Sequence, residues 1–221
     1  MRRRLELLRG RLEDDGIDAL VVTSLPNVRY LTGFTGSAGA AVVTGKEAFL
    51  LTDSRYTTQA EEEVAGLEVQ KVAKLGEGLI QALAMLPARR IAFEAAHLCV
   101  AEHKKMEEGL RPKELVPTEG LIEGFRMVKD SGEVSCIREA VEFARRAFAA
   151  VQELIRPGMS EAEIALELDY QLRKAGSEGN AFDTIVASGE RGAMPHGSAS
   201  GRKLQDGELV TLDFGACACG Y

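Results

Sequence analysis

The apolar positions in the first half of the chain switch repeatedly between helical and strand spacing. Leu5, Leu8 and Leu12 recur at intervals of three and four residues, which predicts an amphipathic helix. Short apolar runs between turn residues predict strands, at residues 19–23, 40–44, 47–51, 67–72 and 90–93. Helical periodicity returns in later segments, at residues 56–64, 79–86 and 100–109. Strands that alternate with helices in this way predict an α/β domain.

Local turn and cap signals add detail to this domain. Gly45 and Lys46 separate two of the predicted strands and indicate a hairpin. Ser54 is expected to cap the helix that follows it. Asp53 and Arg55 flank that serine, and we expect them to form a local ion pair or a contact with another subunit rather than a catalytic pair.

Longer helices replace this alternation in the second half of the chain. Asp130 and Glu133 form a capping pair that predicts a helix start. The apolar residues expected on one face of that helix are Val134, Ile137, Val141, Ala144, Phe148, Val151 and Ile155. A second helix is predicted from the capping box of Ser160 and Glu163 to Gly176, which should end it.

Strands follow these helices and define a second domain. The apolar pattern predicts strands at residues 183–187 and 209–215. The change of pattern places a domain boundary at residue 124, with domains 1–124 and 125–221. Two or three strands with one covered face are only marginally stable. We therefore expect an exposed apolar edge at residues 209–215, and poor solubility or partner-dependent folding of the chain.

Composition excludes several classes of partner. The chain is 45% hydrophobic and 28% charged, with a net charge of −7, which argues against a nucleic-acid-binding protein. No apolar run is long enough for a membrane helix, and no signal peptide is visible, so no membrane partner is expected. The cysteines are Cys99, Cys136, Cys217 and Cys219. Their spacing is not a disulfide framework and fits a reducing cytoplasm.

Asp213 is the most informative candidate for chemistry. The strand pattern around it places Val210, Leu212 and Phe214 on one side, and Leu209, Thr211 and Asp213 on the other. An ionised carboxylate within an apolar strand requires a cation or a set of donors. From the residues alone, Asp213 is either a metal ligand or a buried structural aspartate that accepts backbone hydrogen bonds.

The histidines divide into one functional candidate and two structural ones. His196 lies between a proline and a glycine on a loop near the strand of Asp213, where its ring could reach a ligand. A loop histidine without a role is the alternative. His103 stands among charged residues and is expected on a solvated helix face. His97 lies near a helix start, and we expect it to be structural.

A set of short segments carries a more specific signal. In the first domain these segments are Asn27–Ser37 and Leu51–Tyr56. In the second they are Arg126–Asp130, Phe182–Gly189, Pro195–Gly197 and Leu212–Ala216. Each is weak alone, but together, in this order, they resemble the creatinase and Xaa-Pro peptidase group across essentially the whole chain. The resemblance implies a creatinase-type, ribonuclease H-like α/β domain, followed by a C-terminally truncated, incomplete α+β "pita-bread" domain.

The same resemblance implies a centre of two divalent metal ions, manganese or cobalt, held by two aspartates, one histidine and two glutamates. Asp213 matches the first aspartate. The other ligands match no position in this sequence, so we expect the chain not to bind both ions. His196 matches a histidine that hydrogen-bonds the substrate backbone and the oxyanion of the tetrahedral intermediate. Phe182 and Asp183 are expected to help shape the pocket.

The implied reaction is hydrolysis of the bond before proline in proline-containing peptides, by a metal-bound hydroxide. An X-Pro bond has no N–H, so the site must recognise the ring and the free N-terminus. We expect the protein to be an Xaa-Pro aminopeptidase or dipeptidase, and the 221-residue chain by itself to be inactive. Homodimers are common among similar proteins, so a homodimer is possible. One alternative is a non-catalytic binding module. The other is a metal-free, creatine amidinohydrolase-like enzyme, and an Asp213 placed as a metal ligand argues against this second alternative.

Overall fold

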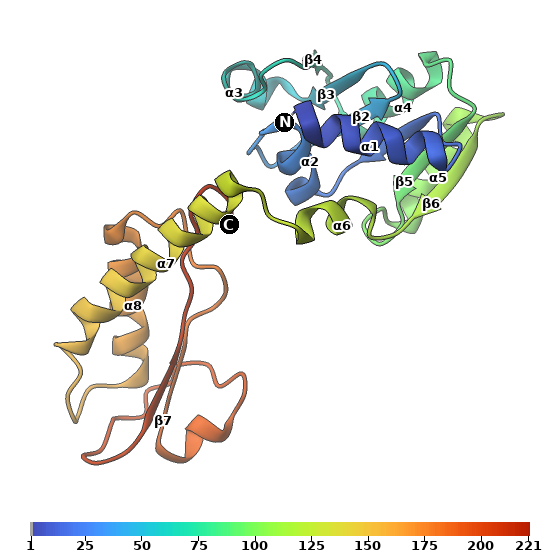
Figure 1. Ribbon diagram of the computed structural model, residues 1–221. Coiled ribbons are helices and arrows are strands. Elements are labelled where there is room, and N and C mark those ends of the chain that lie inside the picture. The colour runs from blue at the N-terminus through green and yellow to red at the C-terminus, as the bar shows by residue number, and fades with distance from the viewer. Residues whose placement is uncertain (1) are drawn as a thin grey trace. The chain divides into compact units, whose positions relative to one another are not determined.

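The computed structural model describes residues 2–221 and contains two compact units (Figure 1). The first, called the N-terminal unit, ends at Val128. The second, called the C-terminal unit, runs from Lys129 to Tyr221. Each is built around buried apolar residues of its own. No helix within residues 2–221 has the length and apolar character needed to cross a membrane.

A mixed six-stranded sheet forms the centre of the N-terminal unit. Its strands are β1 (Ala19–Val22), β2 (Gly39–Thr44), β3 (Ala48–Thr52), β4 (Glu68–Lys71), β5 (Arg90–Glu94) and β6 (Glu114–Thr118). The order across the sheet is β4-β3-β2-β1-β5-β6. β2 pairs antiparallel with β1 and β3, and the other pairs are parallel. The predicted strands and the β2–β3 hairpin are confirmed, whereas β6 was not predicted.

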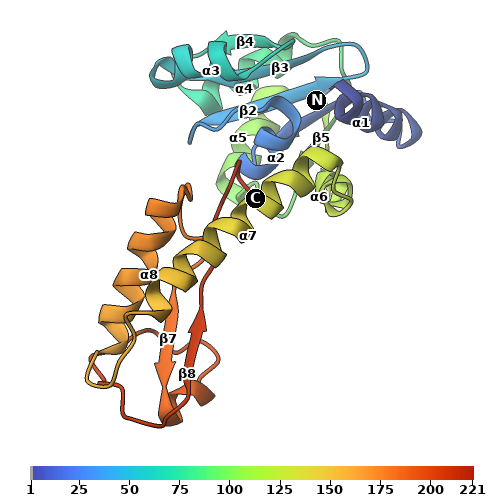
Figure 2. The ribbon, with the colours of Figure 1, turned by 60° about the vertical axis from the view of Figure 1, so that its left-hand side comes forward.

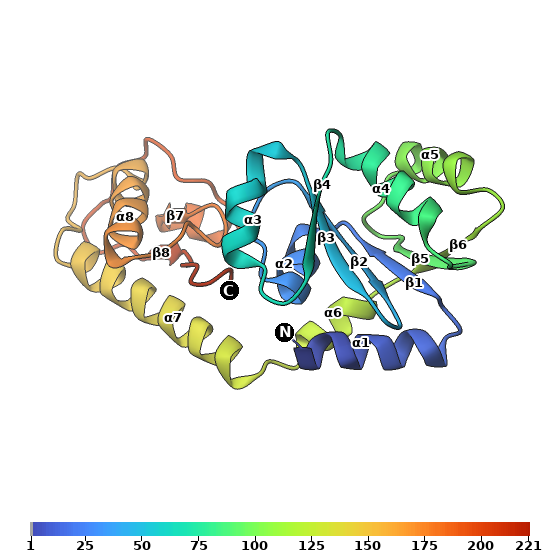
Figure 3. The same ribbon diagram turned by 90° about the horizontal axis from the view of Figure 1, so that it is seen from above.

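Helices cover both faces of this sheet, which makes a three-layer α/β/α unit (Figures 1 and 3). One face carries α1 (Arg2–Asp14), α2 (Leu25–Thr32), α3 (Thr57–Glu63) and α6 (Leu121–Met127). The other face carries α4 (Leu75–Met85) and α5 (Val100–Leu110). Alternate residues of β1 point to the two faces, because Leu20 and Val22 belong to one apolar cluster and Ala19 and Val21 to the other.

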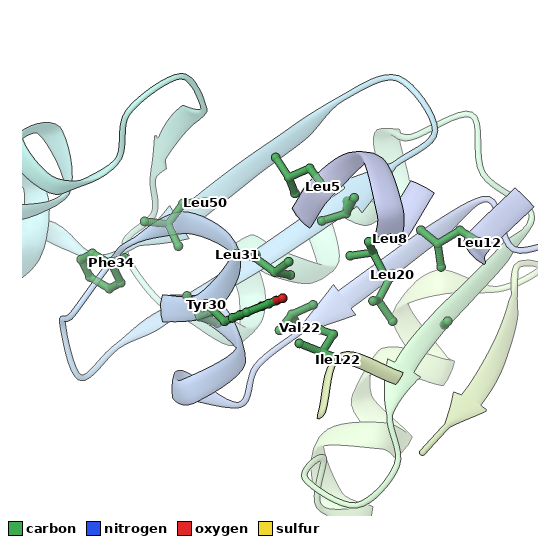
Figure 4. Close-up of a cluster of buried hydrophobic side chains, with 14 of the residues drawn as sticks. Leu5, Leu8, Leu12, Leu20, Val22, Tyr30, Leu31, Phe34, Leu50 and Ile122 are labelled. Atoms are coloured by element: carbon green, nitrogen blue, oxygen red, sulfur yellow. The ribbon is translucent and has the colours of Figure 1, made fainter. Parts of the chain in front are cut away.

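The first of these clusters confirms the predicted face of α1. Leu5, Leu8 and Leu12 are all buried, and Figure 4 shows Leu8 and Leu12 near Leu20 of β1. Burial of such leucines stabilises a fold by about 2 kcal/mol each. The predicted Ser54 cap is wrong. The carboxylate of Asp53 caps a short 3-10 turn, η1 (Ser54–Tyr56), by accepting the Arg55 N–H at 3.0 Å.

The C-terminal unit contains two helices and a two-stranded antiparallel sheet (Figure 2). Its elements are α7 (Ser131–Gln152), α8 (Glu161–Ala175), β7 (Ile185–Ser188), the 3-10 helix η2 (Gly189–Ala193) and β8 (Val210–Asp213). α7 and α8 lie side by side, and α8 packs on β7. Both predicted capping boxes are confirmed, and Gly176 ends α8 at φ 112°, in the left-handed region.

The predicted apolar face of α7 is only partly buried. Val151 is buried, but Ile137 is 37% exposed and Val141 is 61% exposed. Phe148 stacks on Phe214 with ring centroids 6.2 Å apart, yet remains 39% exposed. The positions of α7 that are buried are Glu133, Ala140, Ala147 and Val151. The prediction is wrong in part because the apolar side chains that α7 buries are only Ala140, Ala147 and Val151, although it packs against α8.

Candidate functional site

Asp213 ends β8 on the exposed face of the small sheet. The burial pattern of β8 alternates as the sequence predicted, with Val210 and Leu212 half-buried and Thr211 and Asp213 exposed. Among residues 2–221, no side chain or backbone group forms a hydrogen bond or an ion pair with the Asp213 carboxylate. The alternative of a buried aspartate held by backbone donors is therefore wrong, and the carboxylate is available to a ligand.

The register of β7 brings Asp213 and the loop of His196 to the same end of the sheet. Asp213 is the antiparallel partner of Ile185, the first residue of β7. An isolated antiparallel bridge joins Ile185 to Ser198 as well. Because neighbouring strands lie about 4.8 Å apart, Asp213 and Ser198 flank Ile185 at roughly that spacing on opposite sides. His196 is exposed and precedes Ser198 by two positions.

A glycine allows this loop to lie close to β7. Gly197 is buried, and a Cβ there would lie 3.2 Å from Cβ of Met194 and 3.6 Å from Cβ of Ala187. The Gly197 N–H also donates to the Met194 carbonyl at 3.2 Å. The turn before it is therefore tight, and His196 is carried at its exposed tip.

A second close approach lies just beyond Asp213. The N–H of Ala181 donates to the carbonyl of Gly215 at 3.0 Å. A Cβ at Gly215 would lie 2.9 Å from Cβ of Ala181 and 3.0 Å from the ring of Phe182. Phe182 is 45% exposed and Asp183 is exposed, so both are accessible beside the Asp213 end of β8.

Glu161 is a central residue of this region that the sequence did not reveal. It is the first residue of α8 and is fully buried. Its Oε1 accepts the N–H and the hydroxyl of Ser188, both at 2.8 Å. Its Oε2 accepts the N–H of Ser200 at 3.1 Å, the Ser200 hydroxyl at 2.6 Å and Nε of Arg191 at 3.1 Å. A cap-adjacent glutamate in a first helical turn is indistinguishable, in sequence, from an exposed one.

These contacts set the charge of Glu161. Burial by itself raises the pKa of this carboxyl, but the hydrogen bonds from Ser200 and Ser188 outweigh burial and lower the pKa from 4.5 to about 2. Arg191 adds an ion pair with the carboxylate. Glu161 is therefore an anion at neutral pH, in a buried position that its donors fully satisfy.

The residues of the chain do not fit a pair of bound divalent ions. Within the described range, no group of three or more His, Cys, Asp or Glu side chains is placed to hold a metal ion. Asp213 offers one carboxylate, and neither Asp183 nor His196 joins it in such a group. A centre of two ions needs several oxygen or nitrogen ligands around each ion. The residues present therefore supply at most one ligand of the implied centre.

The other predicted histidines and cysteines lie outside this region. His103 is half-buried and packs against Phe93 of β5 at 5.0 Å between ring centroids, so the predicted solvated helix face is wrong for this residue. The charged residues around His103 in the sequence give no sign that Phe93 is its neighbour in the fold. His97 is exposed in the turn after β5. The four cysteines are free.

Comparison with known proteins assigns both units to families. Residues 4–128 match the family described as Creatinase/Prolidase N-terminal domain, and residues 135–221 match Metallopeptidase family M24. An uncharacterized peptidase of Bacillus subtilis, YqhT, is 40% identical over 99% of this chain and 62% of its own length.

Solved structures give the same assignment. An Xaa-Pro dipeptidase from Bacillus anthracis superposes with a TM-score of 0.94 at 36% identity, covering 100% of this chain and 62% of that chain. An X-Pro aminopeptidase from Thermotoga maritima superposes with a TM-score of 0.87 at 36% identity, covering 92% of this chain and 60% of that chain. The chain thus spans less than two thirds of the length of these relatives. The predicted fold class, a creatinase-type α/β domain followed by part of a pita-bread domain, is confirmed, and the chain belongs to the creatinase/prolidase proteins of metallopeptidase family M24.

Proposed function

We propose that this chain supplies part of an Xaa-Pro peptidase that acts on proline-containing peptides. The observation that carries the proposal is that Asp213 and Ser198, which lies in the loop of His196, flank Ile185 at one end of the β7–β8 sheet. Family membership supports the reaction class, because relatives of similar identity are an Xaa-Pro dipeptidase and an X-Pro aminopeptidase.

The two residues have different roles in this proposal. Asp213 supplies one carboxylate ligand to a divalent metal centre, of manganese or cobalt, whose other ligands lie outside residues 2–221. The unpartnered, exposed carboxylate suits this role, since oxygen ligands are those that hard cations prefer. His196 donates a hydrogen bond to the carbonyl oxygen of the substrate, where negative charge develops during attack. Phe182 offers an exposed ring for the apolar proline side of the substrate.

The 221-residue chain by itself should not hydrolyse X-Pro peptides, because one carboxylate does not hold the metal centre. The test is incubation of the purified chain with an Ala-Pro dipeptide and an Ala-Pro-Ala tripeptide, with Mn²⁺ or Co²⁺ added, followed by chromatography of the products. Turnover by this chain would overturn the assignment of the missing ligands.

A chimera tests the positive half of the proposal. Residues 1–221 would be joined to the remaining C-terminal part of the Bacillus anthracis dipeptidase, which covers the same fold. The chimera should cleave X-Pro peptides in a metal-dependent manner and lose both activity and bound metal on Asp213→Asn. Asp206→Asn, at an exposed position of the same unit, is the matched control and should retain both. His196→Ala should lower kcat by about a hundredfold, as for loss of one oxyanion donor, with metal content unchanged.

Three further properties are part of the same proposal. The bound ions are manganese or cobalt, the protein acts as a homodimer, and it is located in the cytoplasm. The free cysteines support a reducing compartment. Metal analysis of the chimera and its mass by light scattering test the first two.

A further inference from the structure

We propose that Glu161 is a positioning residue for His196, because its buried carboxylate holds both ends of the loop that carries the histidine. This loop, residues 189–199, is called the His196 loop. The inference rests on the proposed role of His196, and it adds a residue from the start of α8 that lies outside the loop and outside the strand of Asp213.

Each of the two carboxylate oxygens of Glu161 binds one end of the loop. Ser188 is the last residue of β7 and precedes the loop, and both its N–H and its hydroxyl donate to Oε1. Ser200 follows the loop, and both its N–H and its hydroxyl donate to Oε2. One rigid, bidentate group therefore fixes the distance between the points where the loop leaves and returns.

Arg191 adds a brace inside the loop. Its Nε donates to Glu161 Oε2 at 3.1 Å, and its Nη2 donates to the carbonyl of Ser198 at 2.8 Å. Ser198 in turn forms the bridge to Ile185. The tight turn between these tethers contains His196, which projects from a frame fixed on both sides.

A second ion pair supports the same frame. Arg202 binds Glu208 through two hydrogen bonds of 2.7 Å, and its Nη1 also donates to the Ser188 hydroxyl. The Ser188 hydroxyl is thereby oriented to donate its own proton to Glu161. Cooperative networks of this kind hold a single geometry when every member is satisfied.

Capping of α8 does not account for Glu161. The N-terminus of α8 is already capped by Ser160 and Glu163, which exchange hydrogen bonds with each other's backbone N–H groups. A glutamate in the next position could stay in water and still favour the helix dipole. Glu161 is instead fully buried, at a cost in desolvation that its loop contacts offset. Its contacts are with the loop ends rather than with the helix.

The test compares matched variants of the 221-residue protein by hydrogen–deuterium exchange read out by mass spectrometry. Glu161→Gln keeps the shape of the side chain but replaces one acceptor oxygen by an NH2 donor. This donor cannot accept a hydrogen bond from the N–H group of the loop end that it faces. Exchange of residues 189–199 should rise by about tenfold or more relative to exchange of α7 and α8. The control is Glu163→Gln, two residues away on the same turn, which should affect α8 and leave the loop unchanged.

Two further measurements make the outcome decisive. Ser200→Ala removes one donor without altering the carboxylate, and should loosen the loop to a smaller degree even if Glu161→Gln fails to fold. In spectra of ¹³C-labelled histidine, the His196 signal should broaden or move in both variants. The signals of His97 and His103, in the other unit, should stay unchanged.

Equal acceleration of the loop and of both helices would overturn the proposal, since Glu161 would then serve only general stability. An unchanged loop and an unchanged His196 signal in both variants would overturn it as well. None of these measurements depends on turnover. Failure of the proposed catalytic role of His196, shown by a His196→Ala chimera with undiminished activity, is therefore distinguishable from failure of the positioning role of Glu161.

Discussion

The ionisation of Glu161 links the stability of the C-terminal unit to pH. Its pKa is lowered to about 2 in the folded protein from an ordinary value of 4.5, because its hydrogen bonds outweigh burial. Such a group stabilises the fold fully above the ordinary pKa, and the stabilisation is lost as pH falls toward the folded pKa. Arg191, Ser188 and Ser200 are the groups that face it directly.

This linkage predicts a difference between wild type and Glu161→Gln that depends on pH. At pH 7 the wild type should be the more stable, by a margin that shrinks on the order of 3 kcal/mol between pH 7 and pH 2. Urea unfolding of the C-terminal unit at several pH values measures the margin. A margin that stays constant with pH would show that the carboxylate has an ordinary pKa in the folded state.

Sequence patterns predicted single residues well where the environment is local. Asp213 was placed on the correct face of its strand because strand side chains alternate regardless of what surrounds them. Glu161 was missed because its partners, Ser188 and Ser200, come from a distant part of the chain. The prediction for His103 was wrong for the same reason, since its neighbour Phe93 belongs to a strand earlier in the sequence.

Helix ends in the C-terminal unit followed from short capping signals. Asp130 with Glu133 and Ser160 with Glu163 begin α7 and α8 as predicted, because each pair satisfies backbone donors within a single turn. Two elements of the N-terminal unit, β6 and α6, were not predicted. β6 contains Pro117, which weakens a strand pattern, and α6 begins after a glycine in the left-handed region, without a side-chain cap.

α2 was not predicted because the backbone N–H groups at its start are bound by a side chain of another strand. Ser24, its N-cap, makes no side-chain cap. The carboxylate of Glu94, at the end of β5, accepts the N–H groups of Thr23 and Ser24 at 2.7 and 2.8 Å instead. It also accepts Nδ2 of the fully buried Asn27 at 2.6 Å. Glu94 therefore acts as a helix cap supplied by a neighbouring element.

Removal of this distant cap should destabilise the N-terminal unit. Glu94→Ala removes the acceptor of two backbone N–H groups and one of the two acceptors of the Asn27 amide, which should lower the free energy of unfolding by about 2 kcal/mol. Glu114→Ala, which removes only an exposed ion pair with Arg90, should cost less than about 0.5 kcal/mol. Equal effects of the two substitutions in urea unfolding would rule out the capping role.

The two units differ greatly in the amount of apolar core that they contain. Two clusters of buried residues cover both faces of the six-stranded sheet in the N-terminal unit. The buried cluster of the C-terminal unit consists of Val151, Ile164, Leu168, Val186 and Leu204. Its sheet has two strands, and Val141 and Leu209 are 61% and 88% exposed. Stability that depends on buried apolar area should therefore be lower in the C-terminal unit.

This asymmetry predicts two thermal transitions, with the C-terminal unit melting first. Ser160→Ala removes a cap of α8 and should lower only the first transition, by about 1 kcal/mol at its midpoint. Glu94→Ala should lower only the second, since its contacts lie wholly within the N-terminal unit. Differential scanning calorimetry of the two variants assigns each transition to its unit. One sharp transition whose calorimetric and van't Hoff enthalpies agree, shifted by both substitutions, would contradict the prediction, because the two cores would then unfold as a single cooperative body.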